Sequence, residues 1–166
     1  MKTEFIQQYA HTWRVLAGIV KDFDQETWLH YGCGTMTPAR DTFHLLQGVK
    51  YYIEDRSTLT FASGKSFDSH CGTVPEAELP SQADVLACSA ELQAKTEVWL
   101  LNMDFAAENK AFEWTGKTQL SVALFLLRHM LYHLGELSSM LNESRQGAAE
   151  DNWFKALQTN PAAHSN

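Results

Sequence analysis

Residues 128–137 of the chain read RHMLYHLGEL. This stretch contains two histidines, His129 and His133, four residues apart. An α-helix turns by about 100° per residue, so both imidazole rings lie on one helix face. The apolar residues that share this face are Val122, Phe125, Leu126, Leu137 and Met140. The pattern therefore predicts a helix that directs two neighbouring imidazoles into a protein core.

Two buried imidazoles need partners for their ring nitrogens. One divalent metal ion can bind a nitrogen from each ring, while the other nitrogens donate hydrogen bonds to neighbouring groups. The alternative is a pair of neutral core histidines that bond to side chains or to backbone carbonyls. The His-x-x-x-His spacing by itself allows both interpretations.

Periodic apolar residues predict four helices in all, separated by segments that contain Gly and Pro. The expected ranges are 3–23, 38–60, 82–103 and 118–142, and the last holds both histidines. Thr37 and Pro38 are typical of an N-cap followed by a first helical residue, and Ser81 to Asp84 resembles a capping box. These features predict an all-α protein, a single antiparallel four-helix bundle.

The connection between the second and third helices is long, contains Gly64, Gly72, Pro75 and Pro80, and shows no clear period. It has room for a crossover rather than a tight hairpin, and for a short turn or a strand pair. A short C-terminal amphipathic turn with Trp153, Phe154 and Leu157 is expected to dock on the bundle. We therefore expect one domain over residues 1–157 and a disordered tail over residues 158–166.

Length and composition restrict the class of protein. A chain of 166 residues is the size of one domain and can bury its own core. The three cysteines, Cys33, Cys71 and Cys88, show no Cys-x-x-Cys spacing, which favours a reducing, cytoplasmic location. No apolar run approaches the ~20 residues of a membrane span, so no membrane partner is expected. A net charge of −7 without a basic stripe argues against a nucleic-acid partner.

A metal site of this kind usually needs a third ligand from another helix, and His44 in the second helix is the best placed. It lies at the edge of the apolar arc, which suits a ligand in a cleft and equally suits an exposed histidine. Glu136 shares the face of His133 and is a hydrogen-bond acceptor, a general base, a fourth ligand or a surface carboxylate. Arg128 is either a partner for a substrate carboxylate or a surface charge. The remaining histidines are expected to be exposed: His11, His30, His70 and His164.

Residues 41–46 (DTFHLL) and 129–137 (HMLYHLGEL) resemble the motifs of the DinB/YfiT-like family of small helical metalloenzymes. The resemblance covers the chain from Phe5 to Leu157, and it implies a four-helix bundle. In that family one histidine of the second helix and a His-x-x-x-His pair of the last long helix bind a divalent metal. The resemblance thus implies that His44, His129 and His133 are metal ligands, with one coordination position left open. Glu136 stands where relatives often carry Gln or Glu.

Characterised members of the family include thiol-dependent S-transferases and maleylpyruvate isomerases that use bacillithiol or mycothiol. The resemblance therefore implies a metal-dependent transferase that acts on a small molecule, with a divalent metal (Zn, Ni or Fe) and a low-molecular-weight thiol as cofactors. We expect Glu136 to be catalytic, Trp114 or Trp153 to line the pocket, and the protein to be a homodimer.

Two alternatives stay open. The same site can hold hydroxide and hydrolyse a substrate, or the protein can be a non-catalytic bundle that binds a metal or a small ligand. Other chemistries lack their motifs, because the chain has no Gly-x-Ser-x-Gly, no Gly-rich phosphate loop and no His-Glu-x-x-His. These absences argue against a serine hydrolase, a P-loop NTPase and a zincin protease.

Overall fold

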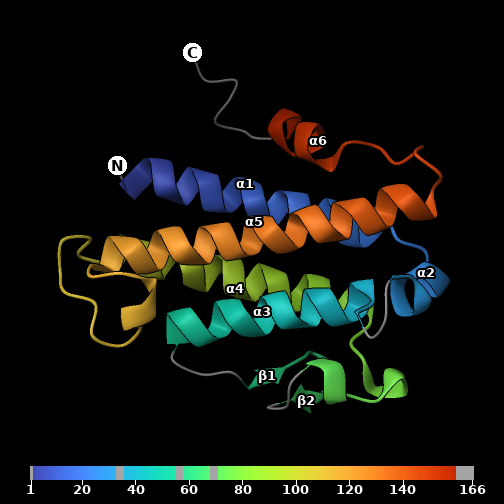
Figure 1. Ribbon diagram of the computed structural model, residues 1–166, viewed down its shortest axis with the longest axis horizontal. Helices are drawn as coiled ribbons and strands as arrows, with labels where there is room; N and C mark the ends of the chain where they lie inside the picture. Colours follow the sequence, from blue (N-terminus) through green and yellow to red (C-terminus); the bar gives the residue numbers. More distant parts are fainter. Residues whose placement is uncertain (1, 33–35, 55–57, 68–70, 160–166) are drawn as a thin grey trace.

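The computed structural model describes residues 2–32, 36–54, 58–67 and 71–159. The described chain is mostly helical, as predicted. Four long helices lie side by side (Figure 1): α1 (Lys2–Asp22), α3 (Pro38–Glu54), α4 (Gln82–Asn102) and α5 (Gln119–Ser144). Among the described helices, none combines the length and the apolar character that crossing a membrane requires.

The helices begin where the sequence signals predict. Ser81 caps α4: its side chain accepts a hydrogen bond from the Asp84 backbone, and the Asp84 side chain accepts one from the Ser81 backbone, which confirms the capping box. Pro38 is the first residue of α3. The predicted end of that helix at residue 60 is wrong, because α3 ends at Glu54 and Leu59–Thr60 form strand β1. Pairing of β1 with the next strand places the Leu59 side chain in the core instead.

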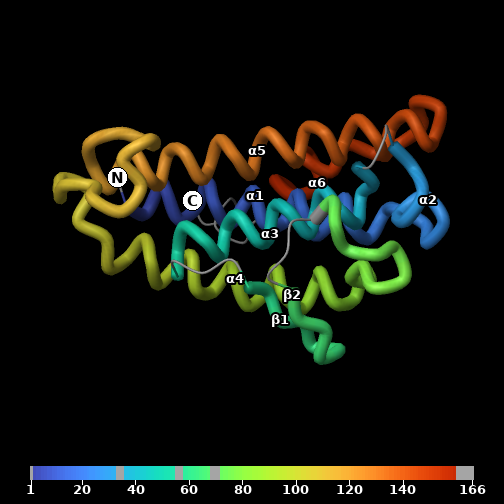
Figure 2. The backbone as a smooth tube through the Cα atoms, turned by 60° about the horizontal axis from the view of Figure 1, so that its bottom comes forward, coloured from blue at the N-terminus to red at the C-terminus, as the bar shows by residue number. Residues whose placement is uncertain are grey.

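The connection between α3 and α4 contains the strand pair that the sequence allowed. Strand β1 pairs antiparallel with β2 (Ser66–Phe67), and the hairpin lies beside α3 (Figures 1 and 2). Phe43 of α3 contacts Phe67, with ring centroids 5.3 Å apart, which fixes the hairpin on the helix. The short helices are α2 (Gln25–His30), η1 (Cys71–Thr73), η2 (Glu76–Glu78), η3 (Glu113–Thr115) and α6 (Asn152–Gln158). Helix α2, which begins after its N-cap Asp24, lies outside the helices predicted from the sequence.

The long helices are not all antiparallel to their neighbours. Helix α1 packs against α4 and α5, and α3 packs against the same two helices, so α4 and α5 lie on opposite sides in Figure 2. Lys2 donates to the carbonyl of Leu101, so α1 and α4 are antiparallel, whereas Tyr9 donates to the carbonyl of Ala123, so α1 and α5 are parallel. Helices α3 and α4 are also parallel, because the connection between them returns along the molecule (Figure 1). The long connection thus makes a crossover.

The C-terminal helix α6 docks on α1, but with a different face from the predicted one. The side chains expected to be buried, Trp153, Phe154 and Leu157, are 42%, 63% and 43% exposed. The buried residues of α6 are Asn152 and Ala156. Phe154 and Leu157 therefore do not carry the docking as predicted, whereas Trp153 packs against His11 of α1 and a polar network also holds α6. Residues 160–166 of the expected tail lie outside the described residues.

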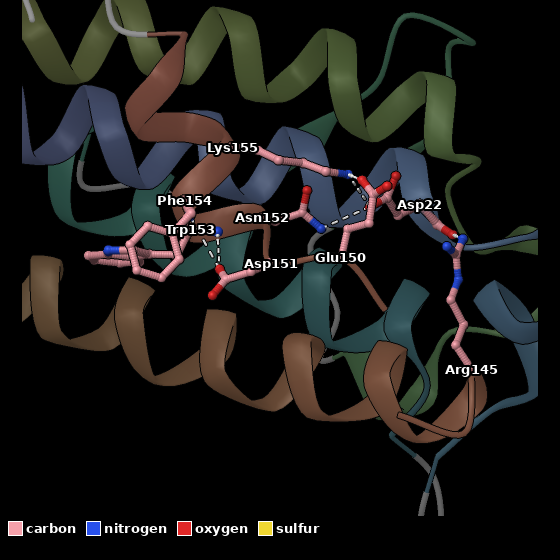
Figure 3. Close-up of polar contacts among 8 residues, drawn as sticks. All are labelled: Asp22, Arg145, Glu150, Asp151, Asn152, Trp153, Phe154 and Lys155. Atoms are coloured by element: carbon pink, nitrogen blue, oxygen red, sulfur yellow. Dashed lines mark hydrogen bonds and ion pairs between the residues drawn. The ribbon is translucent and has the colours of Figure 1, made fainter. Parts of the chain in front are cut away.

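Asp22 at the end of α1 is the centre of this network (Figure 3). Its carboxylate accepts a hydrogen bond from the Asn152 side chain at 3.0 Å and pairs with Lys155 at 3.3 Å, while its backbone carbonyl accepts from Arg145. Gly18, one turn earlier on α1, makes room for this arrangement, because a side chain there would collide with Asn152. The packing of α6 on α1 therefore depends on Gly18 and on the carboxylate of Asp22.

Candidate metal centre

Three histidines meet where α3 and α5 pack against each other. His44 comes from α3, and His129 and His133 come from successive turns of α5. Their ring centroids lie 4.6 to 5.6 Å apart, and one ring nitrogen from each lies within 4.8 Å of the others. The structure therefore brings together all three residues that the sequence proposes as ligands.

The site also contains a carboxylate that sequence reasoning missed. Asp41 of α3 has no solvent exposure, and its Oδ1 accepts a hydrogen bond from Nδ1 of His133 over 2.7 Å. Asp41 precedes His44 by three residues, so both side chains lie toward one side of α3. That spacing is the signal that could have identified Asp41, although it does not reveal the partner on α5.

The hydrogen bond to Asp41 decides which nitrogen of His133 can bind a metal. An ionised carboxylate only accepts, so this contact is a hydrogen bond when Nδ1 of His133 carries the proton, and that tautomer leaves Nε2 available. Burial lowers the pKa of His133, but the hydrogen bond and charge of Asp41, assisted by Glu136, outweigh burial and raise it. The ring therefore has the hydrogen-bonded second nitrogen that histidine ligands of metals commonly have.

The environment of His129 differs from that of His133. Burial, together with the charges of His133 and His44, lowers the pKa of His129 to about 4, so the ring is neutral at pH 7. Its Nε2 is buried and has no hydrogen-bond partner among the described residues. A buried nitrogen without a partner costs free energy unless another ligand satisfies it. A neutral imidazole with an unused nitrogen is the form that binds Zn²⁺ and similar ions.

Gly48 provides the space for this nitrogen. An ideal Cβ atom at Gly48 would lie 2.7 Å from His129 Nε2, closer than real Cβ atoms come to other groups. The three imidazoles, the partnerless nitrogen and the missing side chain at position 48 fit a divalent transition metal. The described residues would supply three imidazole ligands, a number that commonly leaves one position open.

Glu136 lies at the edge of this cluster. Its Oε2 is 3.0 Å from Nδ1 of His133, and its side chain is 38% exposed. A hydrogen bond to Glu136 also raises the pKa of the exposed Tyr132 hydroxyl. Asp41, His133 and Glu136 form a second group of metal-binding types, overlapping the first through His133. Both carboxylates contact Nδ1 of His133, so they lie on the side of the ring opposite to Nε2.

A cavity adjoins the centre through Glu136. It has a volume of about 450 Å³ and lies between the end of α2 and α5. Its lining residues are His30, Tyr31, Gly32, Glu136, Ser139, Met140 and Glu143. A larger hollow of about 630 Å³ lies near the C-terminal ends of α3 and α4, and among its described lining residues none contacts the three histidines, whereas Glu136 of the smaller cavity contacts His133. The smaller cavity is therefore the better placed of the two for a substrate.

The two tryptophans expected in the pocket lie elsewhere. Trp114 donates a hydrogen bond to the Tyr52 hydroxyl at 3.2 Å, and Trp153 packs edge-on against His11 of α1, with centroids 4.4 Å apart. Neither lines the cavity beside Glu136. The expectation that one of them lines the substrate pocket is not supported, because the loop and α6 pack on other faces of the long helices.

The other described histidines divide between exposed and buried sites, and the described cysteine Cys88 is buried. His11 was expected to be exposed but is only 6% exposed, because Trp153 of α6 covers it. His30 is exposed, as predicted, and pairs with Glu76. Cys88 is buried, and burial raises the pKa of its thiol to about 11. Three residues considered in the sequence analysis lie outside the described residues: Cys33, His70 and His164.

Arg128 has the position of a surface charge. Its side chain is exposed, and its guanidinium lies 5.8 Å from the ring centroid of Phe125. Among the described residues it contacts no carboxylate. The structure thus gives it no place in the cavity beside Glu136.

Comparison with known proteins finds no match to a family model, to a curated protein or to a solved structure. The function of the protein therefore has to be inferred from the chemistry of the site. The structure is that of a mostly helical protein in which His, Asp and Glu groups lie close enough to bind a metal ion.

Proposed function

We propose that this protein is a DinB-like four-helix bundle in which His44, His129 and His133 hold a divalent metal ion. We further propose that it transfers a low-molecular-weight thiol to a small electrophile. The observation that carries the proposal is the convergence of three imidazoles between α3 and α5, each with a nitrogen within 4.8 Å of the others. The partnerless Nε2 of His129 supports it, because a metal would satisfy that nitrogen.

A bound divalent cation would lower the pKa of a coordinated thiol or water and so supply a nucleophile at neutral pH. The side chains of the protein would position the ligand, accept the proton and bind the substrate. Asp41 holds His133, and Glu136, which lies on the Nδ1 side of that ring and borders the adjoining cavity, would accept by way of water the proton that the thiol loses. The adjoining cavity of about 450 Å³ would hold the electrophile.

The ligand set restricts the metal to a few candidates. Imidazole suits Zn, Ni, Fe and Cu, whereas Mg and Ca prefer oxygen ligands. Among these metals we propose Zn, Ni or Fe.

A hydrolase on the same site is the second candidate. Three polar side chains in the cavity wall favour it, because Tyr31, Ser139 and Glu143 place hydroxyl and carboxylate groups where water can bind. In that reaction Glu136 would accept a proton from water instead of from a thiol.

Elemental analysis of protein purified without chelator tests the metal. We expect about one equivalent of a transition metal per chain, and loss of most of it in His129→Ala and His133→Ala variants that keep their helical circular dichroism. Metal-free wild-type protein that takes up no Zn²⁺, Ni²⁺ or Fe²⁺ would contradict the proposal.

Activity requires a separate assay. Metal-loaded and metal-free protein are mixed with cysteine, glutathione, bacillithiol or mycothiol and a panel of electrophiles, and the uncatalysed reaction is subtracted. We expect metal-dependent turnover with at least one thiol. Metal-dependent hydrolysis without thiol would favour the second candidate, and no turnover in either assay would favour a non-catalytic metal-binding protein.

We also propose that the protein is a homodimer. Two large apolar side chains on α4, Val98 and Leu101, are 56% and 52% exposed, and such surfaces are common where subunits meet. Light scattering after gel filtration tests this proposal. We expect twice the chain mass of 18.8 kDa, and a mass of one chain would contradict it.

A further inference from the structure

We propose that Asp41 is the positioning residue of the metal centre: it fixes the ring of His133 so that Nε2, and not Nδ1, faces the metal. This inference rests on the proposed function, because it assigns a role in the same site. Helix α3 would then contribute two residues to the site: His44 would bind the metal, and Asp41 would orient His133 of the neighbouring helix α5.

The burial of Asp41 shows that its contact with His133 is its main interaction. A carboxylate with no solvent exposure is costly unless it is paired and hydrogen-bonded. Among the described residues, Oδ1 contacts His133 over 2.7 Å and Oδ2 has no hydrogen-bond partner. The His133 ring is therefore the group that compensates for the buried charge, and its orientation is tied to Asp41.

Glu136 contacts the same nitrogen but cannot hold the ring equally well. Its distance to Nδ1 is longer, 3.0 Å against 2.7 Å, and its side chain is 38% exposed, so water competes for it. Asp41 is enclosed, whereas Glu136 borders the adjoining cavity. This difference assigns orientation of the ring to Asp41 and leaves Glu136 free to exchange protons with a bound molecule.

The first measurement is the Zn²⁺ affinity of metal-free variants, determined by competition with a chromophoric chelator. Asp41→Leu removes the acceptor, and we expect its dissociation constant to rise 10- to 100-fold. Asp41→Asn keeps one acceptor oxygen, so its affinity should be intermediate. Glu136→Gln should change the constant less than about threefold, because Asp41 still holds the ring.

Asp84→Asn is the matched control for the loss of a buried carboxylate. Asp84 is 8% exposed and belongs to the capping box of α4, where its carboxylate contacts Ser81 and Ser63. We expect this variant to melt at a lower temperature and to bind Zn²⁺ as tightly as the wild type. A matching loss of affinity in Asp84→Asn and Asp41→Leu would show that general destabilisation, not positioning, is responsible, and would overturn the inference.

The second measurement reports the tautomer directly. Long-range ¹H–¹⁵N spectra of the metal-free protein, recorded at a pH where the ring is neutral, distinguish Nδ1–H from Nε2–H. We expect His133 to be protonated at Nδ1 in the wild type and to populate both tautomers in Asp41→Leu. Protonation of wild-type His133 at Nε2 would overturn the inference even if no Asp41 variant folds.

The outcomes separate this inference from the proposed function. Wild-type protein that binds Zn²⁺ no more tightly than Asp41→Leu overturns the role of Asp41 alone. Wild-type protein that binds no metal overturns both. Weaker Zn²⁺ binding by Asp41→Leu, with partial recovery of the affinity in Asp41→Asn, supports both the proposed metal site and the role of Asp41.

Discussion

Gly48 of α3 and His129 of α5 approach so closely that a Cβ atom at position 48 would lie 2.7 Å from Nε2 of the imidazole. The two residues belong to antiparallel helices that are packed side by side. The contact leaves the nitrogen of His129 buried beside bare backbone. A methyl group at position 48 would therefore enter the place where this nitrogen would meet a metal ion.

We predict that Gly48→Ala weakens metal binding without removing a proposed ligand. The ring of His129 is the end of a rotatable side chain, so it can move aside and let the protein fold. Ala is also better than Gly inside a helix by about 0.5–1 kcal/mol, which offsets part of the collision. We expect the dissociation constant for Zn²⁺ to rise about 10-fold or more, with the melting temperature of the metal-free protein nearly unchanged.

Gly135→Ala is the control for that experiment. Gly135 lies in α5, close to the site in sequence, but a Cβ atom there would meet nothing within 4 Å. We expect this variant to gain about 0.5–1 kcal/mol of stability and to bind Zn²⁺ like the wild type. Equal affinity of Gly48→Ala and Gly135→Ala would show that the nitrogen of His129 is not a ligand.

We predict that metal stabilises the fold but is not needed to form it. The long helices bury a continuous apolar core, which includes Trp13, Phe43 and Leu126, independently of the three histidines. At a free metal concentration 100 times the dissociation constant, binding adds about 2.7 kcal/mol, which raises the melting temperature by roughly 5–10 °C. Thermal melts with metal and with chelator test this. Loss of helical circular dichroism on chelation at 25 °C would contradict it.

We predict that His11 makes the protein less stable in acid. Burial and the nearby charge of Arg14 lower the pKa of His11 below its ordinary value of 6.5. The unfolded chain then binds a proton more readily than the folded one. Stability is therefore complete above about pH 6.5 and declines as the pH falls below it, by at most about 1.4 kcal/mol per pH unit.

Urea unfolding at pH 7.5 and pH 5.5 measures this effect. The wild type should lose on the order of 1 kcal/mol more than His11→Phe, which cannot take up a proton. Identical pH dependence of the wild type and His11→Phe would contradict the prediction.

We predict that Gly18→Ala releases α6 from α1. A side chain at position 18 would collide with Asn152, whose amide donates to Asp22. Trp153 would then leave the ring of His11. We expect a change in tryptophan fluorescence and faster proteolysis after residue 145, with the metal affinity unchanged. Unchanged proteolysis would show that α6 tolerates the added methyl group.

The sequence alone determined features that depend on neighbouring residues of one segment. The capping box at Ser81, the start of α3 at Pro38 and the common face of His129 and His133 follow from local hydrogen bonding and from the helical period. These features have a short range, so the order of residues along the chain is enough to specify them.

The tertiary structure decided which residues from distant segments meet. Asp41 pairs with His133 and Gly48 accommodates His129 because α3 and α5 pack antiparallel at one particular register. His11 is buried where Trp153 of α6 packs against it. A helical pattern gives the phase of each residue on its own helix, but it contains no information about the neighbour on that side. Long-range packing supplies that information, and with it the hydrogen bonds and pKa values of the site.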